Sequence, residues 1–325
     1  MERARLAGRM AAPAGRPRAS AALAVLAAFL WATYYFFVLS LRGTAPAAVI
    51  AYPFLAGGVA YVAWAAWQGN LHHFLALWRS PSAYLRTLLL VGMQVSVLAA
   101  TYTAGPVDTS LLSLVGDVAL TPLLLVVIYR EGVARARSPS FLAGMALSTA
   151  GASLTIVGGG GTGPMTPLAW LVAPAVPFTV AFYFLLAARA SRAVPTSAVV
   201  GQATVGAGVV SLALSPILPG GVAGLLVPSA HDLLFLVALG LTSFFLAAVF
   251  YFKAIELAGL LLPALLMATI PLFTVVVQLA AFSTTPTEVA LLGIPIAVAG
   301  GILALRGAHP GWTPTYEVAG ELTAK

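Results

Sequence analysis

The sequence contains no cysteine among its 325 residues. A disulfide framework, a thiol nucleophile and a thiolate metal site are therefore all excluded. Charge is scarce as well, because charged residues make up 8% of the chain, against roughly a quarter of a typical soluble domain. A soluble chain of this length needs a more polar surface. The shortage of charge therefore argues against a soluble protein.

Catalytic and nucleotide-binding motifs are also missing. The chain has no Walker A loop and no HExxH pair, and none of its four histidines falls within a long apolar run. Because an intramembrane enzyme needs a nucleophile–base pair or a metal cluster, we predict no catalytic residues, no metal and no cofactor. The net charge of +7 is spread over many short segments, so we predict no nucleic-acid partner.

Long apolar runs dominate what is present. Hydrophobic residues make up 61% of the chain, and ten runs each approach the ~20 residues that cross a bilayer as a helix. The sequence therefore predicts an all-α polytopic membrane protein with ten transmembrane helices. The predicted spans are Ala21–Leu41, Pro46–Trp67, Arg86–Ala104, Thr109–Tyr129, Pro139–Gly158, Pro167–Ala188, Thr196–Leu218, Asp232–Phe252, Leu260–Phe282 and Thr287–Leu305.

The positive charges predict the orientation of these spans. Of the 16 Lys and Arg residues, 15 lie in the two termini or in alternate loops, and only Arg42 lies on the opposite side. Because cytoplasmic loops carry the excess of Lys and Arg, we expect a multi-pass protein of the cytoplasmic membrane with both termini in the cytoplasm. Residues 1–20 and 307–325 are the two predicted cytoplasmic tails.

A weak internal repeat relates the two halves at one offset of 149 residues. The matched pairs are Tyr34 and Tyr183, Tyr102 and Tyr251, Pro122 and Pro271, Gly144 and Gly293, and Gly151 and Gly300. Coincidence in an apolar composition is the alternative explanation. Each half would hold five spans, an odd number, so the second half would enter the membrane from the opposite side. The sequence therefore predicts two inverted five-helix repeats, a common transporter architecture.

Several of these segments resemble the EamA-type repeat of the drug/metabolite transporter superfamily. They are Tyr102–Leu114, Thr121-Pro122, Arg130–Gly132 and Phe141–Gly144 in the first half, and Tyr251–Gly259, Ile270-Pro271, Leu292-Gly293 and Ala299-Gly300 in the second. The resemblance assigns residues 21–160 and 165–306 to two EamA-like repeats. It implies a ten-helix secondary carrier that exports small metabolites such as amino acids.

Asp117 is the most informative polar residue because it lies near the centre of a predicted span. A charge there costs about 3 kcal/mol or more, and intramembrane acids commonly mark a solute or proton pathway. We predict that Asp117 couples transport to a proton or contacts a substrate amine. A carboxyl group held by hydrogen bonds between packed helices is the alternative.

Other span residues complete the predicted site. Gln94 and Gln202 could contact a polar solute, although hydrogen bonding between helices explains them equally well. Tyr34, Tyr183 and Trp31 supply aromatic rings with one polar atom each. Pro122 and Pro271 are predicted hinge or gating positions, because proline frees a helix carbonyl and favours a kink; static kinking is the alternative.

The sequence thus favours a secondary transporter that moves, and by resemblance exports, a small organic metabolite such as an amino acid or amine. Alternating access would move the solute, and a proton could drive it. Two other classes stay open: an intramembrane enzyme, and a non-transporting sensor or lipid-handling protein. The predicted partners are a small-molecule solute and the lipid bilayer, and the sequence leaves a homodimer open.

Overall fold

Helices form all the regular structure in the part of the chain that the structure describes. The structure is a computed structural model, and it describes residues 17–129, 137–157, 174–191, 193–226, 228–258, 261–283 and 287–306. The elements of the first half are α2 (Pro17–Ser40), α3 (Pro46–Trp67), α4 (Leu71–Leu77), α5 (Pro81–Thr103), α6 (Pro106–Val115), η1 (Gly116–Leu120), α7 (Thr121–Tyr129) and α9 (Pro139–Val157). Those of the second half are α11 (Ala175–Ala190), α12 (Thr196–Leu214), η2 (Ser215–Ile217), α13 (Gly221–Leu225), α14 (Ala230–Leu239), η3 (Gly240–Leu246), α15 (Ala247–Ala258), α16 (Leu261–Leu266), η4 (Met267–Thr269), α17 (Ile270–Phe282) and α18 (Glu288–Arg306).

Six described segments are long and apolar enough to cross a membrane. They are Pro17–Ser40, Pro46–Trp67, Pro81–Thr103, Thr196–Ile217, Ala230–Ala258 and Leu262–Phe282. Three shorter apolar helices accompany them, at Pro106–Val115, Ala175–Ala190 and Glu288–Ala304. These segments confirm the predicted all-α membrane class. The count of ten spans and the inverted repeat stay predictions.

Proline sets the start of several helices. Pro46, Pro81 and Pro106 each occupy the first helical turn of α3, α5 and α6, where the missing N–H has no helical partner and the fixed φ already suits a helix. The predicted third span began at Arg86, five residues too late, because hydropathy ends a span at a charge. Arg86, the first residue of the predicted span, therefore lies in the second turn of α5 and is buried.

Two further differences concern the connections. The short helices α4 and α13 lie in segments that were predicted as loops, because helices of five to seven residues leave no periodic hydropathy signal. The start of the predicted span Pro167–Ala188 falls in residues 158–173, outside the described residues, and α11 is described from Ala175.

Two of the long helical segments are interrupted by wide turns in which an amide bonds to the carbonyl five residues earlier. Such turns close η1, where the Thr121 N–H donates to the Gly116 carbonyl, and η3, where the Ala247 N–H donates to the Thr242 carbonyl. Wide turns of this kind are rare in proteins, and those that occur are often found at functional sites. A 3₁₀ turn, η4, interrupts the segment that ends in α17.

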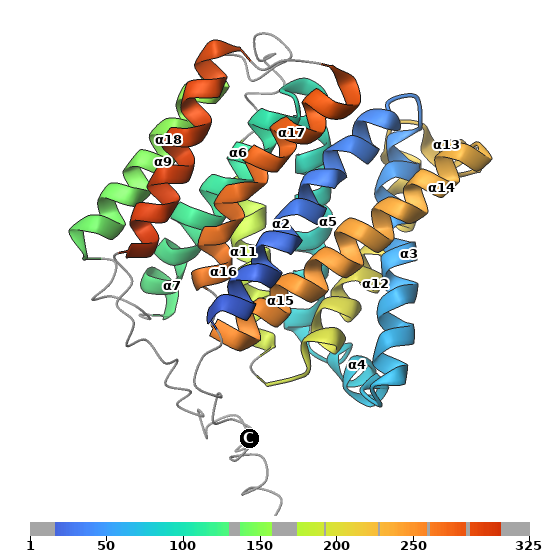
Figure 1. The fold of residues 1–325 in the computed structure, drawn as a ribbon. Coiled ribbons are helices and arrows are strands. Elements are labelled where there is room, and N and C mark those ends of the chain that lie inside the picture. Colours follow the sequence, from blue (N-terminus) through green and yellow to red (C-terminus); the bar gives the residue numbers. More distant parts are fainter. Residues whose placement is uncertain are drawn as a thin grey trace, which may run out of the picture.

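The helices α9 and α18 form a close antiparallel pair at one edge of the molecule (Figure 1). Gly144 faces Gly300, and Gly151 faces Gly293. The two backbones are so close that a Cβ added at any of these glycines would lie 2.6 Å or less from an atom of the facing helix. Small residues allow helices in a membrane to approach in this way. The offset of 149 residues carries the bounds of α9 onto those of α18.

The main core draws buried residues from helices of both halves, including α2, α3 and α5 of the first and α11, α12 and α15 of the second. Its buried aromatic residues include Tyr34, Phe184 and Tyr251, from α2, α11 and α15. In Figure 1, α2 passes through the middle of the helical array, and it begins towards the side on which α18 ends. The centre of the protein is therefore built from both halves.

Candidate functional site: an aromatic cavity around Asp117

A cavity of about 90 Å³ lies in this aromatic centre. Both halves of the chain line it, with contributions from α2, α5, α6 and η1 on one side and from α11, η3 and α17 on the other. The lining residues are Trp31, Tyr34, Tyr35, Met93, Gln94, Val97, Ser113, Asp117, Val180, Phe184, Ser243, Phe244 and Ile270. Four of the six predicted site residues, namely Trp31, Tyr34, Gln94 and Asp117, thus share one cavity.

Asp117 supplies the one acidic side chain in this lining. Its side chain is 3% exposed, and its Oδ1 atom has no hydrogen-bond partner. The Tyr251 hydroxyl group interacts with it electrostatically, and that hydroxyl also lacks a hydrogen-bond partner. An ionised carboxylate buried without donors is strongly unfavourable. The site can therefore accept a proton or a cationic group at Asp117.

The local backbone explains how Asp117 reaches the cavity. It is the second residue of the wide turn η1, and its neighbour Gly116 lies so close to α11 that an added Cβ would sit 2.7 Å from the Pro177 carbonyl oxygen. Glycine thereby lets α11 pack directly against the turn. Val180 and Phe184, on the same helix, line the cavity together with Asp117.

A network of hydrogen bonds and ring contacts holds the other polar residues in place. The Gln94 amide donates to the Tyr34 hydroxyl at 3.1 Å, and the Trp31 indole donates to the Ser243 carbonyl at 2.9 Å. The Trp31 ring also packs edge-on against Phe184 and Tyr251. The hydrogen bond from Trp31 to the Ser243 carbonyl joins α2 to the wide turn η3, so it links the first half of the chain to the second.

The structure places Tyr183 and Gln202 outside this lining. Tyr183 is buried, and its ring packs against Phe184 at 5.2 Å, so it stands behind the cavity wall. Gln202, on α12, is fully buried and bonds to Thr87 and Arg86 of α5. These two predicted site residues therefore belong to a second polar cluster beside the cavity.

Each predicted hinge residue directly follows a break in regular α-helix. Pro122 is the second residue of α7, directly after the wide turn η1, and Pro271 is the second residue of α17, directly after the 3₁₀ turn η4. Both prolines thus stand where regular α-helical hydrogen bonding has just been broken. Their gating role stays a prediction.

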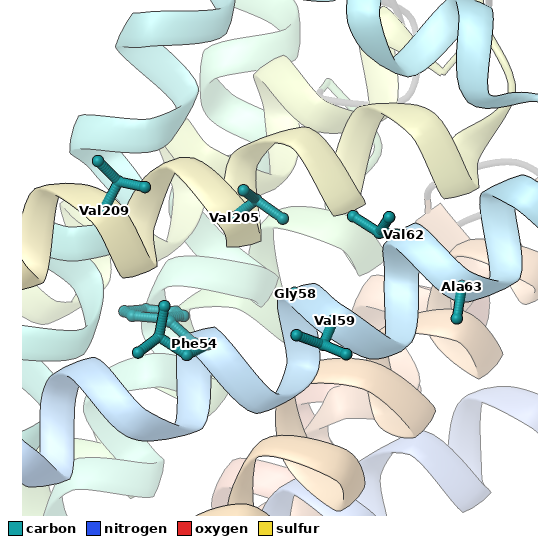
Figure 2. A pocket seen from close by; sticks show the side chains of 8 residues that line it. Phe54, Gly58, Val59, Val62, Ala63, Val205 and Val209 are labelled. Carbon is teal, nitrogen blue, oxygen red and sulfur yellow. The ribbon is translucent and has the colours of Figure 1, made fainter.

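A second hollow, of about 360 Å³, lies between α3 and α12 (Figure 2). Its lining is entirely apolar: Phe54, Leu55, Gly58, Val59, Val62, Ala63, Val205 and Val209. Although it is larger, it has no group that could recognise a polar solute. The Phe54 ring packs at 4.7 Å against Phe244, which lines the smaller cavity, so this aromatic pair separates the two spaces. The cavity around Asp117 is therefore the candidate site.

The sequence analysis missed a second buried acid, Asp108. It lies in the first turn of α6, its side chain is 0% exposed, and neither carboxyl oxygen has a hydrogen-bond partner. The predicted span began one residue later, at Thr109, so Asp108 was assigned to the preceding loop. The start of α6 at Pro106 would have been the signal.

We expect the substitution Asp108→Leu to stabilise the protein, by about 1 kcal/mol or more, because it replaces a buried unbonded carboxyl by an apolar group of similar shape. The measurement is the thermal unfolding midpoint in detergent micelles. Asp232→Leu is the control, because Asp232 is partly exposed and contacts His231. A lower midpoint for Asp108→Leu would show that the carboxyl makes a stabilising contact.

Comparison with known proteins finds one family model and a solved structure of similar fold. Residues 167–306 match the family model of the EamA-like transporter family, part of the drug/metabolite transporter superfamily. The second half of the chain is EamA-like. No curated protein matches the chain. One solved crystal structure is 21% identical, covers 88% of this chain and 96% of its own, and superimposes with a TM-score of 0.67. The chain therefore shares its fold with a solved protein.

The family match covers residues 167–306, which is less than half of the chain. EamA-like proteins are membrane transporters of small molecules, and the apolar helices described above make this chain a multi-pass membrane protein. In such a protein a buried acid facing a cavity between two halves is a candidate contact for the solute. The site residues themselves stay predictions.

Proposed function

We propose that this EamA-like protein is a secondary transporter that exports a small organic metabolite, of the amino acid or amine type, across the cytoplasmic membrane. Alternating access would expose one central site to each side in turn. The observation that carries the proposal is the position of Asp117, a buried acid without a hydrogen-bond partner on Oδ1, in a cavity that both halves line.

The surroundings of Asp117 favour a cationic group on the solute. Trp31, Tyr34 and Phe184 present aromatic rings to the same cavity, and aromatic faces attract ammonium groups. A carboxylate beside such rings would pair with an amine and would bind a proton when the amine has left. We therefore propose that proton and solute exchange at Asp117, which drives export when protons flow inward.

The proposed architecture is ten spans in two inverted five-helix halves with both termini in the cytoplasm. The pairing of α9 with α18 supports it, because Gly144 faces Gly300 while their repeat equivalents, Gly293 and Gly151, face each other. A twofold axis produces such reciprocal contacts. The cavity of about 90 Å³ has space for only a few water molecules, so the halves must part to admit an organic solute.

The proposal is tested by transport in proteoliposomes. Purified protein is reconstituted, the interior is made acidic, and uptake of radiolabelled amino acids and amines is followed with and without a protonophore. We expect at least one compound to accumulate above protein-free liposomes with the same pH gradient, and the protonophore to abolish the excess. The protein-free control is essential because weak bases enter acidic liposomes unaided. A panel without any protein-dependent flux would overturn the proposal.

A further inference from the structure

Arg86 is a buried cation in the second polar cluster, and it lies on α5, the helix that also carries Met93 and Gln94 of the candidate site. It lies in the second turn of α5, and its side chain is 1% exposed. One guanidinium nitrogen donates to the Ser82 hydroxyl at 3.1 Å, and another donates to the Gln202 side-chain oxygen at 3.5 Å. The third, Nε, is buried without a partner. Arg86 is therefore only partly satisfied.

No acidic residue in the described part of the chain pairs with Arg86. The ion pairs found there join His231 to Asp232 and Lys253 to Glu256, and the partners of Arg86 are both neutral. A buried charge without a counter-ion is costly, and charges inside a membrane protein commonly pair or face a pathway. The guanidinium group thus has the capacity to bind an anion from outside the chain.

We propose that Arg86 forms a carboxylate subsite, in which the carboxylate group of the transported solute binds the guanidinium and displaces the side-chain oxygen of Gln202. This inference rests on the proposed transport function and narrows its substrate class to solutes that bear a carboxylate. The planar guanidinium matches a carboxylate with two parallel hydrogen bonds. A single positive charge is neutralised by a single negative one, so a monocarboxylate fits better than a doubly charged phosphate.

The position of the subsite suits a solute that passes between the halves. Arg86 lies on α5 of the first half and Gln202 on α12 of the second, and their contact of 3.5 Å is at the long limit of a hydrogen bond. A carboxylate would form a shorter, charge-assisted bond and displace the amide. Arg86 also interacts electrostatically with Tyr183, whose neighbour Phe184 lines the cavity of Asp117. Parting of α5 and α12 would expose the guanidinium on the helix whose residues Met93 and Gln94 line that cavity.

The experiment titrates full-length protein in detergent micelles with sodium acetate and, at matched ionic strength, with sodium chloride or sodium phosphate. The thermal unfolding midpoint is measured at each concentration. We expect acetate to raise the midpoint of the wild type more than either other salt. In Arg86→Gln the half-saturating acetate concentration should rise about tenfold or more, which is the loss expected for one charge-assisted hydrogen bond.

Three further variants make the result specific. Arg42→Gln removes the same charge from an exposed position and should keep the wild-type response to acetate. Asp117→Asn should also keep it, so failure of the proposed transport mechanism is separable from failure of the subsite. If Arg86→Gln does not fold, Gln202→Leu provides the test, because removing the competing acceptor should lower the half-saturating acetate concentration.

Three outcomes would overturn the inference. The first is a midpoint that rises equally with acetate, chloride and phosphate. The second is an acetate response that Arg86→Gln leaves intact. The third is a Gln202→Leu protein that requires more acetate than the wild type.

Discussion

Replacement of Asp117 by asparagine is expected to reduce proton-driven transport at least about thirtyfold, the effect of losing one member of a buried charge pair worth about 2 kcal/mol or more. The amide keeps the size of the side chain but can neither exchange a proton nor neutralise an ammonium group. Any remaining flux should no longer depend on pH, because the group that titrates has been removed. Initial uptake rates in proteoliposomes between pH 5 and pH 8, a range of about three units around neutrality, provide the measurement.

The control for this prediction is Asp232→Asn. Asp232 lies in the first turn of α14, and its side chain is 29% exposed, so its substitution should leave both the rate and the pH profile of transport unchanged. Asp117→Asn protein that transports at the wild-type rate with the same pH profile would refute the coupling role. Asp117 would then be a structural carboxyl between packed helices.

The second large effect is expected in the pair α9 and α18. In Gly151→Ala the new Cβ would lie 2.3 Å from the backbone nitrogen of Ala297 and 2.6 Å from the carbonyl oxygen of Gly293. Backbone atoms cannot rotate away, so the two helices must separate along their length. Overpacking of this kind costs about 1–3 kcal/mol or more. We expect a clearly lower thermal unfolding midpoint, or a protein that is lost to aggregation during purification.

Gly43→Ala is the matched control, because no atom beyond the adjoining residues lies within 4 Å of the position of its added Cβ. Its midpoint should equal that of the wild type. Gly144→Ala, Gly293→Ala and Gly300→Ala should resemble Gly151→Ala, since all four positions meet opposing backbone. Equal midpoints for Gly151→Ala and Gly43→Ala would show that the two helices are packed less closely than described.

The sequence predicted the class of the fold because a helix that crosses lipid must be apolar over about 20 residues. Apolar segments such as Pro46–Trp67 were located to the residue, since proline and polar residues bound them clearly. Segments interrupted by charge were placed less well. The third predicted span began only at Arg86, and the fourth began just after Asp108, because hydropathy falls at a charged residue, whether that residue lies in water or in the protein interior.

The candidate site was predictable only in part. Asp117, Tyr34 and Gln94 line one cavity, as expected of rare polar residues in spans, and their role in binding stays a prediction. Tyr183 was assigned to the cavity through its repeat partner Tyr34, yet it lies behind the wall, and its neighbour Phe184 faces inward. Adjacent residues on a helix point about 100° apart, so a shift of one position changes the surface that a side chain meets.

Nothing in the sequence marked the wide turns. Neither Gly116–Leu120 nor Gly240–Leu246 contains a proline, and each still breaks the α-helical hydrogen-bond pattern. Packing supplies the reason for the first, because α11 approaches the backbone at Gly116. Such tertiary contacts lie beyond the range of local patterns.

These wide turns affect how the chain can change over evolution. A turn that closes on the fifth residue holds one residue more than a regular turn, so it can absorb the loss or gain of a single residue while the flanking helices keep their facing surfaces. Deletion of one residue within Gly240–Leu246 should therefore be tolerated better than a deletion in α12. Alignments with distant relatives should accordingly place single-residue gaps in these turns, because a gap elsewhere would equate side chains from opposite faces.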